Sequence, residues 1–250
     1  MAETERDLRT DMTKRRTRFL LAVDSDANAL FALSMLLQRF EYTISTAASA
    51  AEALKIATIA APSLVITALA LPDMNGLDFI RRLRQDPRLA SVPFFVKLKE
   101  REPEAERLCR QAGAAACLYP PIQAEDLYQF VQKAIEPTPR SNIRIQTTIA
   151  VTVNDKPLDC VEGECASVLS EHGMYIRTLR PSAVHTRLAI KLVVKNQPIV
   201  AEAVVLYCHK FGEGPFKEPG MGLKFVKIAP ADQERIRLFI REEVTRGMPS

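Results

Sequence analysis

The sequence predicts two domains of different fold class: a doubly wound α/β domain with a parallel sheet, then a small antiparallel β-barrel with a C-terminal helix. Up to residue 136, short apolar runs alternate with helical patterns, which is typical of a parallel sheet. Beyond Pro137 and Pro139 the runs become rich in Val and Ile and are separated by turn signals, which favours an all-β unit. We therefore expect a charged tail over 1–17, an α/β domain over 18–136, a linker over 137–141 and a barrel over 142–250.

The first domain is expected to contain five strands and five helices in alternation. Leu30, Leu33 and Leu37 recur at helical spacing, and Ser49 with Glu52 three residues later forms a capping box that starts the next helix. The expected strands cover 19–23, 43–47, 64–69, 93–98 and 116–119. The other expected helices cover 27–40, 76–84, 102–111 and 126–135.

The second domain is expected to be built from longer strands joined by tight turns. Strands are predicted over 143–153, 189–194, 199–209 and 221–228, and an amphipathic helix over 230–244 closes the chain. Asn154-Asp155, Asn196-Gln197-Pro198 and Gly212-Glu213-Gly214-Pro215 are the turn signals between them.

Composition limits the classes of function. Five cysteines without a C-x-x-C pair indicate reduced thiols in a cytoplasmic protein, and three widely separated histidines give no zinc pattern. No apolar run reaches the roughly 18 residues of a membrane helix, and no signal peptide is visible. A net charge of +4 with few aromatic residues does not favour DNA binding. Without a nucleophile elbow or P-loop, we expect no enzyme, no metal and no cofactor.

The stretch VITALALPDMNGLDFI, from Val65 to Ile80, together with an acidic residue after the first strand, resembles the response regulator receiver domain, whose fold is flavodoxin-like. The resemblance implies two acids that hold Mg²⁺, an Asp that accepts phosphate, a hydroxyl on the fourth strand and a lysine after the fifth. These positions fall here on Asp24 and Ser25, Ala68, Leu98 and Pro120.

A methyl group is no nucleophile, so the resemblance implies a pseudo-receiver that cannot be phosphorylated. We expect Asp24 and Asp26 to cap the first helix, and neither Asp73 nor Asp78 to replace the phosphoacceptor. Such a domain would offer a surface for a protein partner or for self-association.

Arg140-Ser141-Asn142-Ile143-Arg144, then Val168-Leu169-Ser170-Glu171-His172-Gly173, and a late strand with Gly222 and Phe225 are similar to the motifs of the PilZ domain, a family that binds cyclic di-GMP. The resemblance implies that Arg140, Arg144, Ser170 and Gly173 bind the ligand. Guanidinium groups suit it, because they pair with phosphate, contact guanine and stack on bases. Where the family has Asp or Asn, this chain has Val168.

Together the two resemblances imply a two-component-like bacterial signalling protein in the cytoplasm. It would bind cyclic di-GMP through the second domain and pass the signal to a partner, with motility or biofilm regulation as the implied output. The alternative is a ligand-independent protein-interaction scaffold in which both domains are degenerate, because Val168, Ala68, Leu98 and Pro120 all depart from their family patterns.

Overall fold

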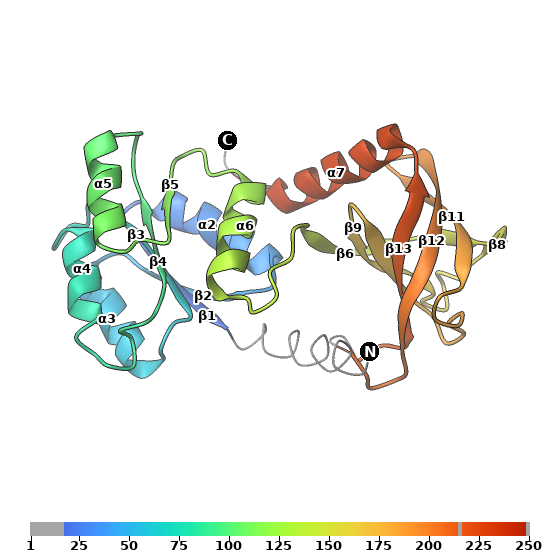
Figure 1. The fold of residues 1–250 in the computed structure, drawn as a ribbon, viewed down its shortest axis with the longest axis horizontal. Helices are drawn as coiled ribbons and strands as arrows, with labels where there is room; N and C mark the ends of the chain where they lie inside the picture. The colour runs from blue at the N-terminus through green and yellow to red at the C-terminus, as the bar shows by residue number, and fades with distance from the viewer. Residues whose placement is uncertain (1–17, 215–216, 249–250) are drawn as a thin grey trace. The chain divides into compact units, whose positions relative to one another are not determined.

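The computed structural model describes residues 18–214 and 217–248 (Figure 1), so the expected charged tail over 1–17 lies outside the described residues. Contacts divide the described chain into two compact units, one that includes residues 18–141 and one from Asn142 to Arg246. Among the described residues, no helix is both long enough and apolar enough to cross a membrane.

The first unit contains a parallel sheet of five short strands. They are β1 (Phe19–Val23), β2 (Thr43–Ala47), β3 (Leu64–Ala68), β4 (Phe94–Lys97) and β5 (Ala116–Leu118). Their order in the sheet is β2-β1-β3-β4-β5. Every residue of β3 is buried, as expected for the central strand of a sheet covered on both faces. The order confirms the predicted doubly wound, flavodoxin-like fold.

Five helices cover the two faces of this sheet (Figure 1). They are α2 (Ala27–Arg39), α3 (Ala50–Ile59), α4 (Gly76–Leu83), α5 (Pro103–Gln111) and α6 (Ala124–Ile135). Helices α3, α4 and α5 bury Ala53, Phe79 and Cys109 in one core with strand residues such as Val65 and Val96. Helices α2 and α6 lie on the opposite face, where Phe40 packs edge-on against Tyr128.

The capping box at α3 forms with one shift. Ser49 Oγ accepts a hydrogen bond from Glu52 N at 3.2 Å, as predicted. The Glu52 carboxylate accepts from Ala48 N at 2.8 Å, one residue before the cap. The first contact satisfies an amide group that the first turn of a helix leaves unpaired, and the second ties the residue before the cap to the helix.

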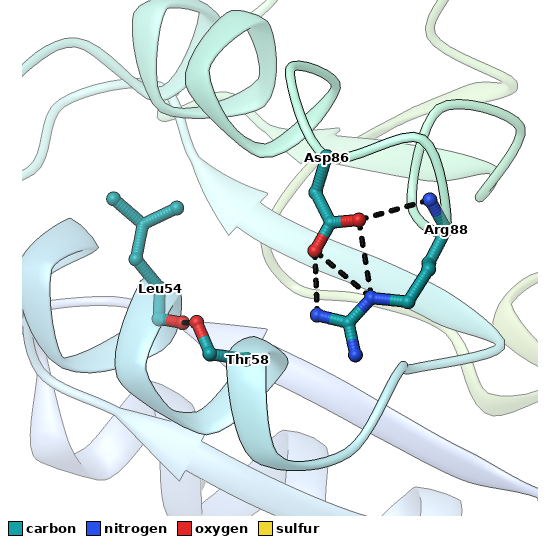
Figure 2. Close-up of polar contacts among 4 residues, drawn as sticks. All are labelled: Leu54, Thr58, Asp86 and Arg88. Atoms are coloured by element: carbon teal, nitrogen blue, oxygen red, sulfur yellow. Dashed lines mark hydrogen bonds and ion pairs between the residues drawn. The ribbon is translucent and has the colours of Figure 1, made fainter.

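Local side-chain contacts close the ends of helices at the surface (Figure 2). Thr58 Oγ1 donates to Leu54 O at 2.8 Å within the last turns of α3. After α4, Asp86 accepts from Arg88 N at 2.9 Å and from Arg88 Nη2 at 2.6 Å. The Arg88 side chain holds the pKa of Asp86 below its usual value. These contacts shape the turn that leads into β4.

The second unit is an antiparallel sheet of eight strands that curls into a half-barrel. The strands are β6 (Arg144–Ile149), β7 (Val151–Val153), β8 (Lys156–Pro157), β9 (Cys165–Ser170), β10 (Gly173–Arg177), β11 (Arg187–Val194), β12 (Gln197–His209) and β13 (Gly220–Ile228). Their order is β6-β9-β10-β13-β12-β11-β7-β8. The run over 143–153, expected as one strand, is interrupted at Ala150, because β6 pairs with β9 whereas β7 pairs with β11.

Strict alternation of side chains separates the core of the half-barrel from its outer face. In β11 every second residue is buried, including Leu188, Ile190 and Leu192. Helix α7 (Pro230–Thr245) packs against β6, β9 and β11 and buries Ile236, Ile240 and Val244. The residues that face outward on β6, β9 and β10 are therefore free to form a site on the barrel surface.

Candidate functional site

The turn after β3 brings the start of α4 close to Ala68, the position that the resemblance to receiver domains assigns to the phosphoacceptor. Gly76 N donates to Leu69 O at 2.7 Å, and a Cβ atom on Gly76 would lie 2.2 Å from Ala68 O. Only glycine allows this approach of the first turn of α4 to the end of β3. The loop is therefore held tightly against Ala68, whose side chain is a methyl group.

A lysine that the sequence reasoning missed occupies the neighbourhood of Ala68. Lys97 is the parallel partner of Ala68 in the sheet, and the Lys97 ammonium forms an ion pair with Asp24 Oδ2. The Asp24 side chain is 11% exposed and that of Lys97 15%. In the register of β1 and β3, Asp24 follows Val23 as Ala68 follows Thr67, so the alanine lies between the two charges.

The structure corrects the expected role of Asp24. Asp26 alone caps α2, accepting from Asn28 N and Ala29 N. Asp24 instead accepts from Asp26 N at 3.0 Å and pairs with Lys97. Ser25 is exposed. A single carboxylate that already pairs with an ammonium does not fit a Mg²⁺ site, which needs several oxygen ligands.

The remaining sequence-predicted positions of the first unit do not supply the missing groups. Leu98 is buried in the core with α3, α4 and α5, on the face opposite Lys97. Asp73 accepts from Ala50 N at 3.0 Å and Ala51 N at 2.8 Å, and these contacts with α3 hold its pKa below its usual value. Asp78 pairs with Arg81 on the surface of α4. Pro120 carries no polar side chain. Within the described residues, no group of His, Cys, Asp and Glu is placed to hold a metal ion.

On the second unit, the strand register brings three of the predicted binding residues together. Arg144 on β6 lies opposite Ser170 on β9, Ser170 lies opposite Gly173, and Gly173 lies opposite Lys224 on β13. Directly opposed residues point to the same face of a sheet, and Arg144 and Lys224 are exposed. The four residues form a cationic row across the outer face of the half-barrel.

Ser170 and Gly173 also have structural roles in this row. Ser170 Oγ donates to Gly173 O at 3.0 Å and so closes the turn between β9 and β10, leaving the hydroxyl as an acceptor. A Cβ atom on Gly173 would lie 2.1 Å from Leu223 O, so the close approach of β10 to β13 requires glycine. Gly173 was expected to let a ligand approach closely. In the structure, the packing of β10 against β13 already requires glycine at this position.

Arg140 belongs to the first unit, unlike Arg144. Its backbone N donates to Gln132 Oε1 at 2.9 Å, and Gln132 Nε2 donates to Tyr42 Oη at 2.7 Å. Tyr42 in turn donates to Glu136 at 3.0 Å, which pairs with Arg18 at 2.8 Å. These contacts tie Arg140, in the expected linker, to Gln132 on α6, so the two arginines are held by different units.

Val168 lies in the second row of the same outer face. It is opposite Gln146 on β6 and Tyr175 on β10, and Tyr175 is opposite Gly222 on β13. A Cβ atom on Gly222 would lie 2.2 Å from the ring of Tyr207, which therefore stacks beside Tyr175 with 6.3 Å between ring centroids. Two stacked tyrosines thus follow Gln146 and Val168 in this row.

The fold and these two sites define a two-domain chain. The first domain is a doubly wound α/β domain with an ion pair beside Ala68, and the second is an antiparallel half-barrel with a cationic row on its outer face. Comparison with family models gives the domains their names. Residues 20–132 match the response regulator receiver domain and residues 138–242 match the PilZ domain. The chain therefore contains a receiver domain followed by a PilZ domain. Both are regulatory domains, and together they support a signalling protein whose PilZ domain binds cyclic di-GMP.

Known proteins similar to this chain match about half of its length. The two-component response regulator ORR3 of rice (Oryza sativa) is 26% identical over 117 residues, which are 46% of this chain and 89% of that protein. The sensory/regulatory protein RpfC of Xanthomonas campestris is 30% identical over 152 residues, 58% of this chain and 21% of that protein. The solved structure of the chemotaxis protein CheY4 of Vibrio cholerae has 28% identity and a TM-score of 0.45, covering 47% of this chain and 98% of its own.

Proposed function

We propose that this protein is a cyclic di-GMP-responsive signalling adaptor, with Arg140, Arg144, Ser170 and Gly173 at the ligand site and a receiver domain that cannot be phosphorylated. In this proposal the PilZ domain senses the nucleotide and the receiver domain presents a surface to a partner or to a second copy. The observation that carries the proposal is the cationic row on the outer face of the half-barrel, in which Arg144 lies opposite Ser170.

The chemistry of the row suits a cyclic dinucleotide. The ligand carries two phosphates, and a guanidinium offers a planar fork of donors to a phosphate and a flat face to a base. Arg144 is exposed at the start of β6, and Lys224 adds a second positive charge in the same row. Ser170 offers acceptor lone pairs, because its proton is directed at Gly173 O.

The receiver half of the proposal rests on the ion pair beside Ala68. The Lys97 ammonium pairs with the one carboxylate that would otherwise hold a cation, and Ala68 offers no oxygen nucleophile. A fixed internal cation makes the electrostatic state of this edge independent of phosphate donors. The domain then contributes binding surface, and its state depends on contacts with other molecules.

Transmission between the domains follows from where the two arginines belong. Arg140 is anchored with the receiver unit through Gln132, whereas Arg144 begins the first strand of the PilZ unit. A ligand that binds both guanidinium groups favours the linker conformations in which both groups can reach the ligand. The ligand shifts the population of domain arrangements by as much as its affinity differs between them.

Titration calorimetry of the full chain with cyclic di-GMP tests the ligand site. Loss of a charge-assisted contact costs about 1.5–3 kcal/mol, so Arg144→Ala is expected to weaken binding by roughly ten- to 150-fold. The matched control is Arg237→Ala, which removes an exposed arginine from α7 that pairs with Glu234, and it should bind as the parent does. Equal binding by Arg144→Ala and the parent would contradict the assigned site.

The receiver half is tested separately, by incubation with radiolabelled acetyl phosphate and Mg²⁺. The protein is expected to remain unlabelled, since Ala68 has no acceptor atom. Acid-labile incorporation, located by mass spectrometry of peptides, would overturn this half of the proposal and leave the ligand site untouched.

A second candidate function is a ligand-independent scaffold, and Val168 is the observation that favours it. An apolar side chain faces outward where the PilZ family places Asp or Asn, next to the exposed amide of Gln146. If the intact protein gives no heat with cyclic di-GMP across a range of salt concentrations, the scaffold is the better account.

A further inference from the structure

A polar pocket adjoins Val168 on the outer face of the half-barrel. It has a volume of about 470 Å³, and its lining includes Val168, Gln146, Thr148, Ser167, Arg177 and Glu218. Since Gln146 lies two residues beyond Arg144 on β6, and Val168 two residues before Ser170 on β9, the pocket begins about two residues, or roughly 7 Å, from the cationic row.

Glu218 in this pocket is held at two points, its carboxylate by an arginine and its backbone carbonyl by a tyrosine. Arg177 Nη1 pairs with Glu218 Oε1 at 3.1 Å, while Arg177 Nε donates to Gly163 O at 2.6 Å. Tyr175, the residue opposite Val168, donates its hydroxyl to Glu218 O at 2.9 Å. The carboxylate therefore needs little further ordering to meet a ligand.

Gly220 makes this arrangement of the segment possible. A Cβ atom on Gly220 would lie 2.2 Å from Ile176 O and 2.9 Å from the Tyr175 hydroxyl. Glycine at the start of β13 thus lets the residues before it lie against β10. The first glycine of the Gly220-Met221-Gly222 stretch serves the pocket in this way, and the second makes room for Tyr207.

Two groups in the pocket still have hydrogen-bonding capacity. Ser167 is the extra residue where the register of β9 against β10 shifts, and its buried Oγ has no hydrogen-bond partner among the described residues. Glu218 uses one carboxylate oxygen for Arg177, and within the described part of the chain the other accepts no hydrogen bond. The Glu218 side chain is 36% exposed and that of Arg177 34%, so a ligand can reach both.

We infer that Glu218, held by Arg177, recognises the guanine base. It would supply the polar contact that the apolar side chain of Val168 cannot make. The inference rests on the proposed binding of cyclic di-GMP. Guanine presents N1–H and the N2 amino group side by side on its Watson–Crick edge, and one carboxylate accepts from both. Ser167 Oγ can donate to the neighbouring carbonyl O6. The positive charge of Arg177 offsets the negative charge of Glu218, so the pocket does not repel an anionic ligand.

The test compares cyclic di-GMP with cyclic di-IMP, which lacks only the N2 amino groups, by calorimetry on the full chain. The parent is expected to bind cyclic di-GMP at least tenfold more tightly than cyclic di-IMP. Glu218→Gln should lose at least tenfold in affinity for cyclic di-GMP and bind the two ligands about equally. Glu202→Gln, which changes a similar Arg187–Glu202 pair with 38% exposure of the glutamate, should behave as the parent does.

A second variant restores an acid on the other side of the pocket. Val168→Asp in the Glu218→Gln background should regain most of the preference for cyclic di-GMP. This recovery would not occur if Glu218→Gln had lost binding because it fails to fold. A parent that binds cyclic di-GMP, together with a Glu218→Gln variant that keeps full affinity and preference, would overturn the role of Glu218 while the ligand site stands. A parent that binds neither nucleotide refutes the proposed function, and this inference with it.

Discussion

Replacing Lys97 with methionine tests whether the ion pair beside Ala68 holds the receiver domain in one state. The variant keeps the length of the side chain and removes its charge, leaving Asp24 at 11% exposure with its remaining hydrogen bond from Asp26 N. We expect Lys97→Met to destabilise the domain, because a mostly buried carboxylate loses its counterion.

The magnitude follows from burial. Two unit charges about 4 Å apart attract by roughly 4 kcal/mol at an effective dielectric constant of about 20, and desolvation offsets part of this gain. Breaking a buried pair by removing one partner costs about 3–5 kcal/mol. Since both side chains retain some exposure, we expect the lower end of that range, about 3 kcal/mol, for Lys97→Met. The double variant Asp24→Asn with Lys97→Met should return close to the parent, because it leaves no buried charge unpaired.

Urea unfolding of the full chain, followed by far-ultraviolet circular dichroism, measures this effect. Five of the six helices in the described residues belong to the receiver unit, so its transition dominates the helical signal. Lys55→Met, at an exposed position of α3, is the control and should change stability by less than about 0.5 kcal/mol. A Lys97→Met variant as stable as this control, with no coupling to Asp24→Asn, would refute the reasoning.

Further outcomes follow from other contacts. Gly173→Ala should unfold the PilZ domain at lower urea concentration than the parent, because its Cβ would meet Leu223 O at 2.1 Å; unchanged stability would show that β10 and β13 can move apart freely. Ala68→Asp is expected to remain unlabelled by acetyl phosphate, since Lys97 would pair with the new carboxylate as well; labelling at residue 68 would show that Lys97 does not block the site. Burial raises the pKa of the Cys109 thiol to about 11, so alkylation of Cys109 by iodoacetamide in the folded protein should be far slower at pH 8 than in urea, and equal rates would contradict its burial.

Periodicity and turn residues predicted the order of elements in the receiver domain. Short β-branched runs and capping residues such as Ser49 act locally, so the sequence displays them directly. The sequence did not reveal that Ile143 to Val153 is divided between two strand pairings, because the partners β9 and β11 are distant in the chain. Closure of a barrel is a long-range property that alternation alone does not encode.

The candidate sites divide along the same line. Motif spacing placed Arg144, Ser170 and Gly173, and the strand register brings them together. Lys97 and Glu218 were missed, because each acts across the fold on a residue far away in sequence. A signal for Lys97 was present: a lysine ends the otherwise apolar Phe94-Phe95-Val96 run, which predicts a buried or edge charge that needs a partner.

Lys97 and Glu218, the two residues that were missed, are both charged. Each lies near a position, Ala68 or Val168, at which this chain departs from the pattern of the family that the domain resembles. Lys97 is the sheet partner of Ala68, and Glu218 is fixed by the tyrosine opposite Val168. The two replacements differ in what they leave available. The Lys97 ammonium and the Asp24 carboxylate pair with each other and are largely buried, so the charge of each is balanced within the receiver domain. Glu218 has a carboxylate oxygen that accepts no hydrogen bond from the described residues, in a pocket that a ligand can reach. In the proposed function, the PilZ domain therefore responds to the small molecule and the receiver domain supplies a binding surface.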